Sequence, residues 1–246
     1  MKTIAVIQHV EAEYLGFLED HLEARNIRFR YFRPFTAGGT LPAGPDENPG
    51  EFDGLIVLGQ GPLGIVSGPL VPTLAPELRI IRTFLDHGLP VVGVGLGAIM
   101  LAVAAGGGAE EAPLRIEVGR ATRENADALG GAMPESFPYA TYIRDRAVLP
   151  KDAEVLARNE AGEPVAFRCG ASAIGFTAHP GIKSAMIEDI IMEFEESPDD
   201  VAEKLESLRN VQGGIAEALT SIMVGLVAET GWMRQEETAQ KASSPS

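Results

Sequence analysis

Cysteine is almost absent from this sequence: its 246 residues include one, Cys169. A single cysteine cannot form a disulfide within the chain, which is typical of proteins from reducing compartments. The first ten residues, MKTIAVIQHV, become polar too early for a signal peptide. No apolar run approaches the roughly 18 residues of a membrane span, and the longest candidate, 214–228, is interrupted by Glu217. We therefore expect a cytoplasmic protein that has no membrane segment.

Positive charge is also scarce, with 20 Lys and Arg against 35 Asp and Glu and a net charge of −15. A surface of this sign repels phosphate groups, so nucleic acid and anionic membranes are not expected partners. Histidine is rare too, and His9, His21 and His87 do not have the spacing of metal ligands. We predict no metal site.

Short apolar runs alternate with helical patterns in the first half of the chain. Strands are predicted at 3–10, 27–34, 52–62 and 89–95, and helices at 14–26, 72–88 and 96–108. Such alternation predicts a parallel sheet with helices on both faces. The fold class is therefore α/β, a three-layer sandwich of the flavodoxin-like type.

The second half of the chain has a different sequence pattern. Between 114 and 180 the segments PLRIEVGRAT, DAEVLARN, EPVAFRCG and SAIGFTAHP predict antiparallel strands added to the sheet edge. Ser197-Pro198-Asp199-Asp200 is a helix start signal, and Gly213-Gly214 is expected to break the helix that follows. We assign 1–196 to one domain, 197–233 to a helical appendage, and 234–246 to a disordered tail.

One stretch, VVGVGLGAIML at 91–101, has the pattern of a nucleophile elbow, a strand that turns sharply into a helix. No Ser, Cys or Thr stands at the bend, which falls on Gly95. An elbow holds its tip residue in a strained backbone conformation, and glycine relieves that strain. Backbone N–H groups of the helix N-terminus would remain there.

Four segments in order resemble the class I (triad-type) glutamine amidotransferases, especially stand-alone proteins similar to the glutaminase half of GMP synthetase. The segments are VIQHVEAEYLGFLEDHL, DGLIVLGQGP, LPVVGVGLGAIMLA and EVLARNEAGEPVAFRCGASAIGFTAHP, and together they cover roughly residues 3 to 190. In that family a cysteine attacks the glutamine carboxamide, a histidine transfers the proton, and a glutamate orients the histidine.

The resemblance places the family's nucleophile at Gly95, its base at His179 and its orienting acid at Gly181. The position of its glutamine-contacting Gln is Ile99. Only His179 keeps the family's residue type, so the chain is expected to lack glutaminase activity.

Backbone donors of an oxyanion or anion type are expected at the emptied elbow, because helix N-termini present unpaired N–H groups. The candidate donors are Gly61, Leu96, Gly97 and Ala98. The alternative is that Ile99, Met100 and other apolar side chains fill the space. Gly93, Gly95 and Ala98 also match the dinucleotide fingerprint, followed by Glu117, but the resemblance already explains these glycines, and no cofactor is predicted.

These observations lead to two functional interpretations, one as a binding protein and one as an enzyme. The chain is expected to be a degenerate amidotransferase-like protein that acts as a binding or regulatory subunit, or as a partner of a synthetase-type enzyme. The alternative is a working enzyme whose pocket acts on a small acid or amide. An apolar stripe from Val201 to Leu226 favours a homodimer if part of it stays exposed; if the domain covers it, the stripe has no such role.

Overall fold

A computed structural model describes residues 1–233 of the chain. Within them, nine strands form one mixed sheet in the order β2-β1-β3-β4-β11-β10-β9-β6-β7. The parallel half consists of β1 (Thr3–Ile7), β2 (Arg28–Phe32), β3 (Gly54–Val57), β4 (Val91–Val94) and β11 (Ala173–Phe176). Its order is that of a flavodoxin-like sheet, so the predicted fold class is confirmed.

The antiparallel half extends the sheet from β11. It consists of β10 (Pro164–Cys169), β9 (Glu154–Asn159), β6 (Arg115–Arg123) and β7 (Ser136–Ile143), and a separate pair joins β5 (Gly108–Glu110) to β8 (Arg146–Val148). Strand β7 was not among the predicted strands. It contains Pro138, a residue that argues against a central strand but is tolerated at the edge position that β7 occupies.

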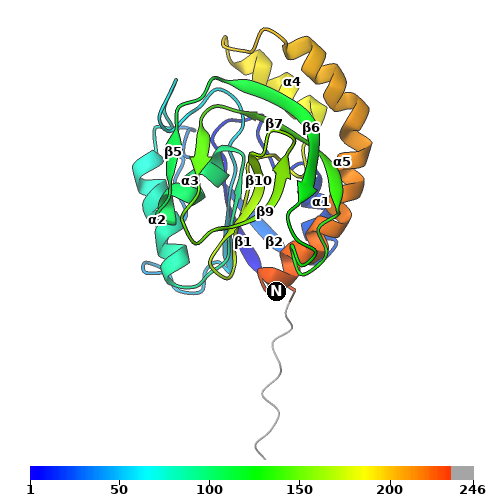
Figure 1. The fold of residues 1–246 in the computed structure, drawn as a ribbon. Coiled ribbons are helices and arrows are strands. Elements are labelled where there is room, and N and C mark those ends of the chain that lie inside the picture. The colour runs from blue at the N-terminus through cyan, green and yellow to red at the C-terminus, as the bar shows by residue number, and fades with distance from the viewer. Residues whose placement is uncertain (234–246) are drawn as a thin grey trace, which may run out of the picture.

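Helices cover both faces of the sheet (Figure 1). On one face, α2 (Leu74–Asp86) and α3 (Leu96–Ala104) bury a cluster that includes Ile81, Ile99 and Leu101. On the other face lie α1 (Phe17–Glu23), α4 (Ser184–Glu193) and α5 (Val201–Glu229). The sheet is therefore the middle of three layers, and the core is divided between its two sides.

Helix α5 is continuous from Val201 to Glu229, so the predicted break at Gly213-Gly214 is wrong. A Cβ atom on Gly214 would lie 3.0 Å from the ring of Pro138 in β7. Glycine therefore lets the helix approach the sheet closely, and packing outweighs its low helix propensity.

The apolar stripe of α5 faces its own domain. Leu208, Ile215, Leu219, Ile222 and Leu226 are all buried, and Val201, Leu205 and Val211 pack against the same core. By length and composition α5 could cross a membrane, but here it packs on α1, α4, β6 and β7. The stripe is therefore largely covered by the domain, with Val201, Leu205 and Val211 half-buried, while Val224 of the same helix is exposed. The predicted tail, 234–246, lies outside them.

Candidate functional site

The predicted elbow is present at the carboxyl end of β4. Gly95 has φ 60° and ψ −121°, and α3 begins at the next residue, Leu96. This backbone conformation is open to glycine and costly for residues with a Cβ atom. The expectation that glycine relieves strain at the elbow tip is confirmed by these angles.

The space in front of Gly95 is filled. A Cβ atom on residue 95 would lie closer than 3.0 Å to the carbonyl oxygen of Gly59 and to Nε2 of Gln60. The same Gly59 oxygen accepts a hydrogen bond from the Leu96 N–H at 2.8 Å. Because the nearest atom belongs to the backbone, it cannot turn aside as a flexible side chain would. The elbow therefore has no room for a nucleophilic side chain in this geometry.

Gln60 was missed by sequence reasoning. Its side chain is 1% exposed, and Oε1 accepts a hydrogen bond from the Tyr142 N–H at 3.0 Å while Nε2 is directed at Gly95. The amide is thus anchored to β7 through Oε1, while Nε2 lies beside the elbow without a hydrogen-bond partner. The glycines that flank it, in the segment GQG, were the only local signal of a close approach at this turn.

The predicted anion donors are mostly engaged within the protein. The Leu96 N–H donates to Gly59, the Ala98 N–H donates to Gly95 at 3.0 Å, and the Gly61 N–H donates to Tyr142 at 2.6 Å. A Cβ atom on Gly97 would collide with the carbonyl of Val57 in β3, so this glycine serves helix–strand contact. Each of these three N–H groups donates to a different carbonyl, so an anion could reach them only after those backbone contacts opened. Backbone and Gln60 lie nearest the elbow tip, whereas Ile99 and Met100, named as the alternative fillers, are buried in the core beneath α2 and α3.

The segment that closes the elbow is held firmly from the end of β7. Arg144 donates from Nε to the carbonyl of Pro62 at 2.9 Å. Asp145 is fully buried, and its carboxylate accepts the N–H groups of Ile65 at 2.8 Å and Val66 at 3.0 Å. Burial opposes ionisation of Asp145, but hydrogen bonds from Ser67 and these amides outweigh it and lower its pKa.

His179, the one triad position that keeps its residue type, is buried and has both ring nitrogens engaged. Nε2 donates to the carbonyl oxygen of Tyr14 at 2.9 Å, and Nδ1 accepts from the Gly181 N–H at 3.1 Å. Burial lowers its pKa to about 4. The imidazole is therefore neutral at physiological pH, and its accepting nitrogen already holds a backbone hydrogen bond. In this geometry it is not free to take up a proton.

Gly181, at the family's acid position, has no space for a carboxylate. A Cβ atom there would lie 2.8 Å from the Leu18 nitrogen and 2.9 Å from the Leu15 oxygen at the start of α1. The Gly181 carbonyl also accepts the Phe17 N–H at 2.8 Å. The loop after β11 and the first helix are thus packed backbone against backbone, which excludes an orienting acid.

A second polar cluster lies at the carboxyl end of β1. His9 Nε2 is 2.8 Å from Oε2 of Glu77 in α2, and its Nδ1 is 3.7 Å from Oε2 of Glu13; the two carboxylates are fully buried. Burial lowers the His9 pKa, but the charge of Glu77 and the hydrogen bonds of both carboxylates outweigh it and raise the pKa to about 10. Burial raises the pKa of Glu13.

This cluster could exchange protons but has almost no access to solvent. The His9 side chain is 3% exposed, and the small pocket that it lines is walled mainly by apolar residues such as Leu63 and Val71. The residues described contain no group of three or more His, Cys, Asp and Glu that could hold a metal ion. The cluster's role here is to join β1, the following loop and α2.

Comparison with known proteins gives structural matches only. No family model and no curated protein matches the sequence. A glutamine amidotransferase from Thermotoga maritima has a TM-score of 0.74 at 22% identity, covering 93% of this chain and 98% of its own. A glutamine amidotransferase from Methylobacillus flagellatus has a TM-score of 0.79 at 22% identity, covering 99% and 100%.

A protein from Thermoplasma acidophilum that is described as part of a GMP synthase has a TM-score of 0.55 at 16% identity, covering 87% of this chain and 98% of its own. Identities this low show the fold and not the activity. The strand order, the elbow between β4 and α3, and these superpositions agree with one another. The chain has the fold of the class I glutamine amidotransferases.

Proposed function

We propose that this protein does not hydrolyse glutamine and that it acts as a binding or regulatory subunit. The observation that carries the proposal is the contact between the Gly59 carbonyl and the elbow at Gly95. Hydrolysis of an amide at an elbow needs an activated nucleophile there, because an amide is a poor electrophile. Gly95 supplies no such group, and the surrounding backbone leaves no room for one.

The remaining catalytic parts support the same proposal. The ring of His179 is neutral and held by two backbone groups. The backbone N–H groups of Gly61 and Leu96, which could stabilise an oxyanion, donate to carbonyls of the protein. Nucleophile, base and oxyanion donors act as a unit; here the first is missing, and the other two are engaged within the protein.

A partner role is suggested by one structural relative, which is described as a subunit of GMP synthase. By analogy, the partner proposed for this chain is a synthetase-type enzyme. A cytoplasmic location and a homodimeric state are further proposals that rest on the sequence. The alternative function, an enzyme acting on a small acid or amide, would need a pocket other than the closed elbow.

The test is ammonia release from glutamine by the purified full chain. We expect no release above a buffer blank, and no rescue by Gly95→Cys, because the new side chain meets the Gly59 carbonyl and His179 stays engaged. Turnover by the wild-type chain that His179→Ala abolishes would overturn the proposal. A Gly95→Cys variant that gains such turnover would show that the elbow can open.

A further inference from the structure

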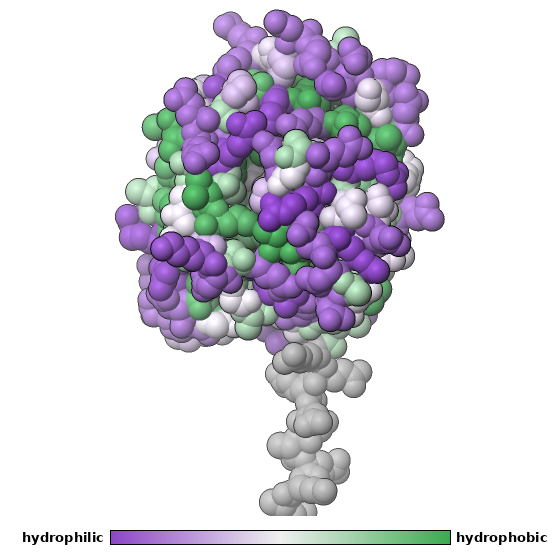
Figure 2. Space-filling model, in the orientation of Figure 1, coloured by the Kyte–Doolittle hydropathy of each residue, from purple (hydrophilic) through white to green (hydrophobic). Residues whose placement is uncertain are grey.

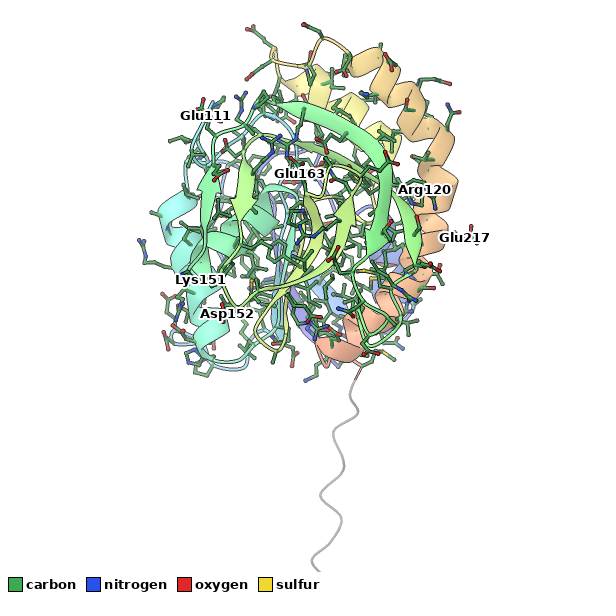
Figure 3. All side chains as sticks on the ribbon, viewed as in Figure 1. Glu111, Arg120, Lys151, Asp152, Glu163 and Glu217 are labelled. Carbon is green, nitrogen blue, oxygen red and sulfur yellow. The ribbon has the colours of Figure 1, made fainter. Side chains whose placement is uncertain are left out.

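A cavity on the concave side of the antiparallel half of the sheet is not explained by the elbow. About 500 Å³ of space, part of it open to solvent, lies between side chains of β6, β7, β8 and β10. In Figure 2, hydrophobic side chains are visible among charged ones in the centre of this face, and Figure 3 places Glu163 near its middle. Neither Gly95, His179 nor Gly181 lines it.

Two arginines line the cavity, each paired with a glutamate. Arg115 Nε lies 3.0 Å from Glu117 Oε1, and Arg146 Nε lies 2.8 Å from Glu163 Oε1. Arg115 Nη1 also donates to the carbonyl of Asp145 at 3.2 Å, so its guanidinium is anchored beside the residue that precedes Arg146. The two arginines therefore come from neighbouring points of the cavity wall.

The arginines have more donors than their partners use. Each guanidinium carries five N–H groups, and the contacts above use Nε of both arginines and one Nη of Arg115. Glu117 also accepts a hydrogen bond at Oε2 from the hydroxyl of Tyr139, at 3.4 Å. The Arg146 side chain is 45% exposed, which leaves its Nη groups able to meet a ligand. The contacts described therefore leave guanidinium N–H groups of both arginines available to a ligand.

Two threonine hydroxyls of the cavity wall donate within the protein. The hydroxyl of Thr141 donates to the Thr177 carbonyl at 2.8 Å, and the hydroxyl of Thr177 donates to the Pro164 carbonyl at 2.7 Å. Val165 and Ile143 present apolar surface between them. A ligand would therefore place an apolar body on the floor and an acceptor group at the arginines.

We propose that this cavity binds a small carboxylate with an apolar body, held by the guanidinium groups of Arg115 and Arg146. Guanidinium and carboxylate match in shape and can form two parallel hydrogen bonds. The two arginines would repel an amine, and the carboxylates of Glu117 and Glu163 are each already paired with one of these arginines. The site is independent of the elbow, so it stands whether or not the chain hydrolyses glutamine.

The test uses three probes of one shape: phenylacetate, phenylacetamide and phenethylamine. Each is titrated into the isotope-labelled full chain while backbone amide shifts are recorded. Phenylacetate is expected to shift the amides of Thr141, Val165 and Thr177 and to bind at least about fivefold tighter than the amide, with the amine weakest. Equal affinity of the three probes, or shifts located elsewhere, would overturn the proposal.

Matched variants separate the guanidinium contact from general charge. Arg146→Gln is expected to weaken phenylacetate binding about fivefold or more, whereas Arg120→Gln should leave it unchanged. Arg120 lies on β6 as Arg115 does, but it is exposed, donates to Ser136 and lies away from Glu163 (Figure 3). Arg146 is at the rim, so its variant should keep the parent melting temperature. Equal losses of phenylacetate affinity in Arg146→Gln and Arg120→Gln would contradict the assignment of the carboxylate to Arg146.

Discussion

The carbonyl oxygen of Gly59 occupies the space into which a side chain at Gly95 would project, and it accepts the N–H of Leu96 at 2.8 Å. This one contact explains two features together. It fixes the start of α3 against the end of β3, and it makes the elbow tip a position for glycine alone. The chain keeps the strand–turn–helix geometry of an amidotransferase and closes the place where that geometry would present a nucleophile.

The contact predicts that Gly95→Ala destabilises the protein by more than its backbone angles alone would. A positive φ costs an alanine roughly 1–2 kcal/mol, and overpacking against a rigid backbone adds about 1–3 kcal/mol. The measurement is the free energy of unfolding in urea.

Gly88→Ala is the matched control for this prediction. Gly88 also has a positive φ, 65°, but no atom lies within 4 Å of a Cβ built there. Gly88→Ala should therefore lower the free energy of unfolding only by the amount that a positive φ costs an alanine. Equal losses of stability at positions 88 and 95 would mean that the Gly59 contact is not limiting.

The elbow conformation could be predicted from sequence because strand, glycine turn and helix are consecutive at 91–101. The closure of the elbow could not be predicted from sequence, because Gly59 and Gln60 follow a different strand, β3, and meet the elbow only in the folded chain. The same reason hid the pair of His9 and Glu77, which are 68 residues apart. Periodicity reports which face of an element is buried, but not which elements meet at their ends.

The ion pair of His9 and Glu77 predicts a loss of stability when Glu77 is replaced by glutamine. The substitution leaves buried His9 with only Glu13, whose carboxylate lies 3.7 Å from Nδ1, and breaking a buried pair costs about 3–5 kcal/mol. Glu51→Gln is the comparison, since Glu51 pairs with the half-exposed Arg30 and should cost at most about 1 kcal/mol. Chemical denaturation of both variants checks the difference, and a small loss in Glu77→Gln would contradict the buried pair.

The same cluster predicts a pH dependence of stability on the alkaline side. The folded pKa of His9, about 10, is above its ordinary value of 6.5. Its contribution is therefore complete below pH 6.5 and is lost as the pH rises through 10. Unfolding free energies between pH 7 and pH 10 should fall more steeply in the wild-type chain than in His9→Gln. Parallel profiles would show that His9 is not held in its charged form.

The lowered pKa of His179 predicts that the stability of the protein also falls at acidic pH. Its folded pKa of about 4 is below its ordinary value of 6.5. The unfolded chain binds the extra proton first, so stability falls as the pH drops from 6.5 towards 4, by about 1.4 kcal/mol per unit. His179→Gln should flatten this part of the profile. The imidazole nitrogen resonances should report a neutral ring at pH 5.5, and a charged ring there would contradict the two backbone contacts.

The packing of α5 predicts that its inner residues stabilise the domain itself. Leu219→Ala should cost about 2–5 kcal/mol, because Leu219 is fully buried against the sheet. Val224→Ala should cost little, because Val224 is 53% exposed. Truncation after Ser197 should give an insoluble or unfolded chain. Light scattering that shows a soluble, folded monomer after truncation would contradict this role of the helix.

Ammonia release from glutamine tests the central claim most directly. The purified full chain is incubated with glutamine, and ammonia is measured against a buffer blank and against His179→Ala. The closed elbow at Gly95 and the engaged ring of His179 predict that all three give the same signal. Ammonia production by the wild-type chain that disappears in His179→Ala would contradict the account.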